Sequence, residues 1–169
     1  MAITLYQASV PAFTRGLKQL RAVLAKADSQ AQQMKVEGAV LLQSRLYPNM
    51  FPLVRQVQIA CDFAKGTCSR LAGKEPPSFA DSEASFADLY ARIDKTLAVI
   101  EALTPAQIDG QEERAVEIKA GQRILNFKGL QYLLGFSLPN FYFHLTTAYA
   151  ILRHNGIELG KPDFIGPLD

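Results

Sequence analysis

The sequence predicts an all-α protein in which four long helices pack as a bundle, with a small β-hairpin between the third and the fourth helix. Apolar residues recur every three or four positions in four long segments, which is the period of an amphipathic helix. Residues 116–119 and 125–127 instead alternate apolar and polar side chains, as strands do. The 169 residues match the length of one domain, so we interpret residues 1–169 as a single helical domain.

The first long helix is expected from about Thr4 to Gln33. Pro11 either kinks this helix or sits in its first turn, where the missing N–H of proline costs little, and both alternatives stay open. We expect residues 36–46 to include a short helix. The buried face of the first helix shows spacings of three and four residues and consists of Val10, Phe13, Leu17, Leu20 and Leu24.

The second long helix is expected from about Met50 to Ala72. Asn49 is the predicted N-cap, Pro52 falls in the first turn, and Gly73 ends the helix. Gln58 lies beside the apolar stripe, so we expect its amide to point inward. The stripe itself consists of Leu53, Val54, Val57, Cys61, Ala64, Cys68 and Leu71.

The two cysteines, Cys61 and Cys68, lie seven residues apart on this second helix. Two helical turns place their α-carbons about 10 Å apart, which is beyond the reach of a disulfide. We therefore expect reduced thiols in the core, which fits a cytoplasmic protein. No neighbouring base lowers the pKa of either thiol, so a catalytic cysteine is not expected.

Residues 74–85 predict a loop because prolines, serines and charges gather there. The third long helix then runs through Leu103, and Ser82 and Asp81 are the alternatives for its N-cap. A short turn begins at Thr104. The buried face of the third helix consists of Phe86, Leu89, Tyr90, Ile93, Leu97 and Ile100.

The alternating residues 116–119 and 125–127 flank Ala120 and Gly121, which offer a turn, and this pattern predicts a β-hairpin. A single hairpin is only marginally stable by itself. We therefore expect it to pack on the bundle or to pair across an interface between two chains.

The fourth long helix begins near Lys128, is interrupted around Pro139 and runs on to Asn155. Asn140 either continues the helix or caps its second half, and both alternatives stay open. The segment is apolar on most sides, which indicates a helix inside the bundle. A second stripe is more polar and consists of Asn140, His144, Thr147, Ala148 and Ile151.

The tail that follows is too rich in glycine and proline for a helix, and three apolar residues in it can attach it to the surface, Ile157, Phe164 and Ile165.

Composition excludes several classes of function. The net charge is +2 and neither sign forms a run, so nucleic acid and anionic membranes are not expected as partners. Residues 129–152 carry no charge, but their amides, hydroxyls, histidine and proline favour a buried helix over a membrane span. The first residues do not resemble a signal peptide. The sequence also contains no phosphate-binding glycine loop, CxxC or HExxH motif.

The two histidines cannot act together from one helix, because ten residues separate them by about 80° around the axis and about 15 Å along it. His154 precedes Asn155 and Gly156, so we expect it to interact with the helix C-terminus. His144 is the candidate catalytic residue. It serves either as a hydrogen-bonded histidine of the core or as a ligand or base.

Three segments carry a resemblance to a known family: LYQASVPAF (5–13), MFPLVRQVQIA (50–60) and LPNFYFHLTTAYAILRHNG (138–156). With them the whole chain resembles an uncharacterised bacterial domain-of-unknown-function family of the DinB/YfiT-like metalloenzyme superfamily. The resemblance implies an up-down-down-up four-helix bundle that is commonly a homodimer. It also implies a divalent metal held by one histidine of helix 2 and two of helix 4, and some relatives transfer low-molecular-weight thiols.

The resemblance places His144 on the second histidine of helix 4 and Asn140 on the first. The ligand of helix 2 falls near Gln58. Neutral amide oxygens bind zinc or nickel poorly, so we expect a degenerate site without a metal, and His144 is the ligand if any metal binds.

Three functions follow from these residues. The first is a metal-free bundle that binds an unknown small molecule, with Gln58, Asn140, His144 and Thr147 lining a pocket. The second is a metal-dependent or histidine-dependent transferase or hydrolase, with His144 as ligand or base and Tyr142, Tyr6 or Tyr90 as candidate acids. The third is a structural dimerisation module, which the hairpin and the aromatic residues Phe136, Phe141 and Phe143 suggest.

Overall fold

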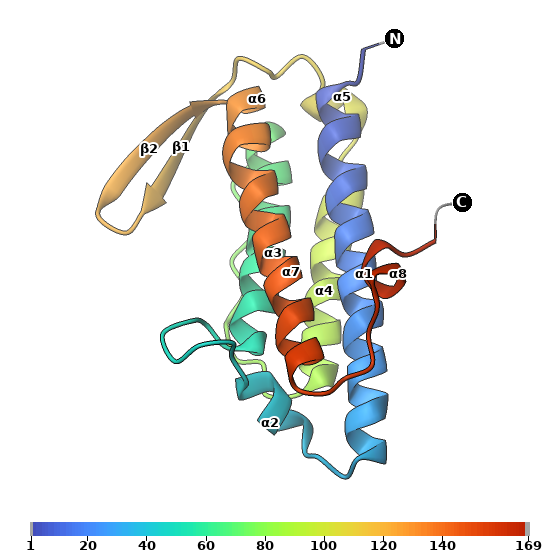
Figure 1. The fold of residues 1–169 in the computed structure, drawn as a ribbon. Coiled ribbons are helices and arrows are strands. Elements are labelled where there is room, and N and C mark those ends of the chain that lie inside the picture. Colours follow the sequence, from blue (N-terminus) through green and yellow to red (C-terminus); the bar gives the residue numbers. More distant parts are fainter. Residues whose placement is uncertain (1, 168–169) are drawn as a thin grey trace.

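The computed structural model describes residues 2–167 and is mostly helical, with one small two-stranded antiparallel sheet, which confirms the predicted class. Four long helices lie side by side, and α3 and α7 share the largest contact between elements (Figure 1). In that view α1 and α7 run downwards, while α3 and α4 run upwards. The long helices are α1 (Leu5–Gln33), α3 (Leu53–Leu71), α4 (Phe86–Glu101) and α7 (Leu138–His154).

Shorter elements close the ends of the four helices and flank them. A turn of π-helix, η1, leads directly into α7. The shorter elements are α2 (Gly38–Gln43), α5 (Pro105–Ile108), β1 (Ala115–Ala120), β2 (Arg123–Lys128), α6 (Gly129–Gln131), η1 (Tyr132–Ser137) and α8 (Lys161–Ile165). Within residues 2–167, no helix, long or short, combines the length and apolar character that crossing a membrane requires.

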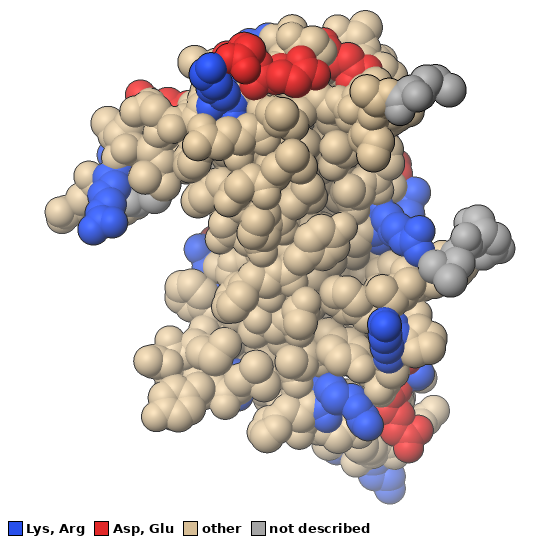
Figure 2. Space-filling view, turned by 45° about the horizontal axis from the view of Figure 1, so that its top comes forward, with Lys and Arg blue, Asp and Glu red and all other residues tan. Residues whose placement is uncertain are grey.

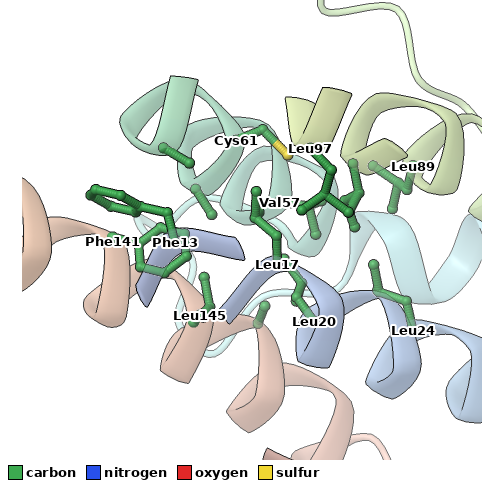
Figure 3. Close-up of a cluster of buried hydrophobic side chains, with 14 of the residues drawn as sticks. Phe13, Leu17, Leu20, Leu24, Val57, Cys61, Leu89, Leu97, Phe141 and Leu145 are labelled. Atoms are coloured by element: carbon green, nitrogen blue, oxygen red, sulfur yellow. The ribbon is translucent and has the colours of Figure 1, made fainter. Parts of the chain in front are cut away.

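The core lies between the four long helices, where side chains from all of them meet (Figure 3). The rings of Phe13 and Phe141 pack edge to face, with their centroids 4.9 Å apart. Gly16 makes this contact possible, because a Cβ atom there would lie 2.5 Å from the ring of Phe141. Cys61 and Cys68 are buried and unbonded, as predicted.

The ends of the predicted helices needed some correction. Thr4 is the N-cap residue of α1. Pro11 lies inside the helix, so of the two alternatives for this proline the position in the first turn does not apply. The start of α3 was also misplaced, because the helix begins at Leu53 with Pro52 as the N-cap residue. A residue before proline avoids the helical conformation, which explains why Asn49 does not cap this helix. A turn occupies that stretch instead, closed by a hydrogen bond from Met50 to Tyr47.

The predicted caps of α4 were wrong as well. Ser85, rather than Ser82 or Asp81, accepts a hydrogen bond from the backbone of Asp88, whose carboxylate accepts one in return from the N–H of Ser85. This reciprocal arrangement satisfies two donors at the start of the helix. The helix ends at Glu101, two residues before the predicted end.

The predicted hairpin is present, with Val116 opposite Phe127 and Gly121 at the turn with a φ of 61°. Val116 is buried and Phe127 is half-buried, so the hairpin packs on the helices.

The interruption in the last helix is the π-helical turn η1, and the chain remains helical through Pro139. A π-helical turn is wider than an α-helical turn, so it leaves room for a proline ring that would otherwise meet the carbonyl of residue 135. Asn140 continues the helix and does not cap it, because its side chain donates to the carbonyl of Phe136 at 2.7 Å.

The prediction of a tail without helix was wrong, since α8 forms a short helix there. Pro162 supplies a favourable residue for its first turn, and the carboxylate of Asp163 accepts from the N–H of Gly160 at 2.7 Å. Two of the three predicted apolar residues attach the tail, because Ile157 is buried and the ring of Phe164 packs against Tyr149, whereas Ile165 is exposed. Residues 168–169 lie outside the described part of the chain.

Candidate functional site

The candidate site is centred on His144, which α7 directs toward α3. Its Nδ1 atom lies 2.7 Å from the side-chain oxygen of Gln56. The amide nitrogen of Gln56 donates to the carbonyl of Phe51 at 3.0 Å, which leaves the amide oxygen to accept a hydrogen bond. Nδ1 of His144 is therefore the donor, and the neutral imidazole keeps its lone pair on Nε2.

Aromatic rings surround the imidazole. The ring of Phe63 on α3 stacks on it with centroids 6.0 Å apart and an angle of 21°, and the ring of Phe143 meets it edge to face at 5.3 Å. Burial lowers the pKa of His144 below its ordinary value of 6.5, and the positive charge of Arg55 lowers it further. The imidazole is therefore neutral at pH 7.

The structure does not bring the four predicted site residues together. Asn140 and Thr147 bond to carbonyls of their own helix, those of Phe136 and Phe143, at 2.7 Å in each case. Gln58 is buried as expected, but its amide nitrogen donates to Glu83 at 2.7 Å. Within residues 2–167 these polar groups support the helices and the 74–85 loop.

The amide that faces His144 is that of Gln56, two positions before Gln58. Residues two apart on a helix point about 200° away from each other, and only one of these two can face α7. The spacing of seven between Gln56 and Phe63, both of which contact His144, is the signal in the sequence that identifies this face.

The candidate acids do not meet His144. The hydroxyl of Tyr90 on α4 donates to Asp28 of α1 at 3.2 Å, and burial together with that carboxylate raises the pKa of Tyr90 to about 12. Tyr142 is exposed on α7, and Tyr6 lies in the first turn of α1, where its N–H bonds to Asp109. His154 lies in the last turn of α7, as predicted.

The residues around His144 do not fit a zinc or nickel ion. They supply one imidazole and the neutral amide of Gln56, and the second predicted amide, that of Asn140, bonds to the backbone carbonyl of Phe136. The oxygen atoms of neutral side-chain amides are weak ligands for zinc and nickel. In the part of the chain that the structure describes, no group of three His, Cys, Asp or Glu side chains is placed to hold a metal.

A cavity of about 320 Å³ adjoins this site. Phe63 connects the two, because its ring lines the cavity and also stacks on His144. The cavity lies between α3, β1, η1 and the loop after α3. No local pattern in the sequence marks it, because these segments are far apart in the chain. Its lining consists of Asp62, Phe63, Lys65, Gly66, Arg70, Pro76, Ile118, Lys119, Tyr132 and Phe136.

A cluster of charges around the buried side chain of Arg92 lies beside this cavity. The side chain of Arg92 is 2% exposed and its guanidinium contacts Asp62 at 2.9 Å and Glu83 at 2.8 Å. Burial would raise the pKa of Glu83, but hydrogen bonds from Arg92 and Gln58 outweigh it and hold that pKa below its ordinary value. The cluster fixes the 74–85 loop against α3 and α4, which shapes one wall of the cavity.

One face of the molecule is broadly uncharged (Figure 2). Large apolar side chains are exposed around α7 and in the loop before α3. Phe143 is 56% exposed and Phe51 is 55% exposed, whereas Phe141, one of the three aromatic residues predicted for an interface, is buried in the core.

Comparisons with known proteins identify the family and a solved structure of similar fold. The model of a family described as "Domain of unknown function (DUF1993)" matches residues 5–165. A crystal structure of a DinB family member protein from Shewanella denitrificans is 40% identical to this chain. The match covers 97% of this chain and 93% of that protein, with a TM-score of 0.87. No curated protein matches the sequence.

Proposed function

Since this chain belongs to the family described as Domain of unknown function (DUF1993), we propose that it is a small-molecule-binding helical bundle of DinB type in which a hydrogen-bonded pair replaces the metal centre. The pair consists of Gln56 and His144. In this proposal the four long helices form one up-down-down-up bundle. The two unpaired cysteines favour a cytoplasmic protein, because an oxidising compartment tends to pair thiols.

The observation that carries the proposal is the double contact of Phe63. One ring stacks on an imidazole held by Gln56, and the same ring forms a wall of the 320 Å³ cavity. The cavity has the size and the aromatic lining of a small-molecule site. His144 therefore acts as a positioning residue for the wall, and its polar neighbours on α7 stabilise that helix.

Two measurements test this proposal. Protein purified without a histidine tag should contain well below one equivalent of metal per chain, and added zinc or nickel should leave its melting temperature unchanged. Uncharged 2-naphthalenemethanol should bind and shift the NMR signals of Phe63 and Phe136. Stoichiometric metal that is lost in His144→Gln would contradict the proposal, and so would the absence of any naphthalene binding.

A second candidate function is dimerisation through the uncharged face. The specific observation is the exposure of the large aromatic side chains of Phe143 and Phe51, since exposed apolar side chains favour contact with a partner. Light scattering should then give a homodimer at micromolar concentration, and Phe143→Ser should convert it to a monomer without loss of helix content. A wild-type monomer would contradict this function.

A further inference from the structure

The cavity beside Phe63 has one aromatic and one cationic part. Phe63 and Phe136 pack edge to face with centroids 5.7 Å apart, and Tyr132 stacks on Phe136 at 6.0 Å. Arg70 and Lys119 also line the cavity. A ligand that fills this space therefore meets flat apolar surfaces as well as positive charge.

Arg70 is positioned toward the cavity by two features. Its Nη1 atom lies 3.4 Å from the hydroxyl of Tyr132. The same atom would lie 2.7 Å from a Cβ atom at Gly66, so the absence of a side chain at Gly66 leaves the space that the guanidinium occupies. Within residues 2–167, neither Arg70 nor Lys119 forms an ion pair with a carboxylate.

The carboxylate of Asp62 does not neutralise these two cations. Its Oδ1 atom lies 2.9 Å from Lys65 and 2.9 Å from Arg92, so two other cations already compensate it. No other Asp or Glu lines the cavity. The lining therefore keeps a positive charge that a ligand can satisfy.

We propose that this cavity binds a small organic anion with a flat apolar body, such as an aromatic carboxylate. The anionic group bonds to Arg70 and Lys119, and the ring packs against Phe63 and Phe136. A guanidinium is suited to this task, because its fork of N–H donors matches a carboxylate in a bidentate contact. This inference rests on the proposed function, since it names the class of ligand for the same cavity.

The test compares two probes that share one ring system. Calorimetric titration should show that 2-naphthoate binds at least tenfold more tightly than uncharged 2-naphthalenemethanol. Added salt should weaken the binding of 2-naphthoate but not the binding of 2-naphthalenemethanol. Arg70→Met should remove this preference, and Arg70→Lys should keep part of it. Arg123→Met, which removes an exposed arginine near the hairpin turn, is the matched control and should bind as the wild type does.

The outcomes separate the two proposals. Equal affinity for both probes would overturn the anionic ligand class while small-molecule binding stands. Equal weakening by Arg70→Met and Arg123→Met would show that binding depends on net charge, which also overturns it. If neither probe binds to the wild type, both proposals fail. Melting curves of the variants establish that each is folded.

Discussion

The imidazole of His144 and the side-chain amide of Gln56 share a buried hydrogen bond of 2.7 Å that joins α7 to α3. Gln56→Met keeps the length of the side chain but removes the acceptor. We expect a loss of about 1–3 kcal/mol in the free energy of unfolding, because the Nδ1–H group of His144 stays buried without a partner. Urea denaturation measures this loss. Gln131→Met, at an exposed position, is the control, and equal effects of both substitutions would contradict the structural role of Gln56.

The stability of the protein should depend on pH through His144. Its folded-state pKa is lowered by burial and then by Arg55, so the unfolded chain binds a proton at higher pH than the folded chain. The stabilisation is therefore complete above the ordinary pKa of 6.5 and is lost as the pH falls from there toward the lower folded-state pKa. Denaturation midpoints between pH 8 and about pH 5 measure the effect. His144→Gln should flatten this dependence and His154→Gln should not, and an unchanged slope in His144→Gln would refute the assignment.

Arg92 should contribute far more to stability than an exposed arginine. Arg92→Met leaves Glu83, whose side chain is 9% exposed, without its buried cation, and breaking such a buried pair costs about 3–5 kcal/mol. The control is Arg21→Met, because Arg21 pairs with Asp94 at 2.7 Å but is 41% exposed, and exposed pairs contribute about 0–1 kcal/mol. Chemical denaturation of both variants provides the comparison. Similar losses of unfolding free energy in the two variants would mean that the charge cluster does not hold the 74–85 loop.

Gly16 and Gly135 should respond in opposite ways to alanine. A Cβ atom at Gly16 would lie 2.5 Å from the ring of Phe141, so Gly16→Ala should destabilise the protein by about 1–3 kcal/mol. A Cβ atom at Gly135 meets nothing within 4 Å, and alanine restricts the unfolded chain more than glycine does. Gly135→Ala should therefore be neutral or slightly stabilising in thermal melts. A tolerated Gly16→Ala would show that α1 and α7 are not in close contact there.

Both cysteines should be inert in the folded protein. Burial raises the pKa of Cys61 to about 12 and raises that of Cys68 as well, so neither forms a thiolate at pH 8. A thiol-specific reagent should label neither residue until denaturant is added, and should then label both. Rapid labelling of the native protein would indicate an opening of the core between α3 and α4.

The helices could be predicted from the sequence because apolar spacing determines which face of each helix is buried. The apolar stripe of α1, which includes Leu17, and that of α3, which includes Val57, do meet in the core. The starts of α3 and α4 were less predictable, since Asn49 and Ser82 are ordinary capping residues and only the local turns decide against them.

The candidate site was predicted only in part. His144 was identified because it is the buried imidazole of a mostly apolar helix, but its partner depends on how α3 is rotated against α7, which spacing within α3 does not determine. The cavity requires four segments to meet, and Arg92 finds one partner, Glu83, in the loop after α3 and another, Asp62, on α3 itself. Such long-range contacts leave no local pattern in the sequence.

The proposed replacement of a metal centre by the pair of Gln56 and His144 is tested most directly by the nitrogen-15 NMR spectrum of the His144 imidazole. At pH 7 we predict a neutral ring with the proton on Nδ1 and an unprotonated Nε2, and no change when zinc is added in excess. A proton on Nε2, or a zinc-dependent shift of either nitrogen at one equivalent, would contradict the account.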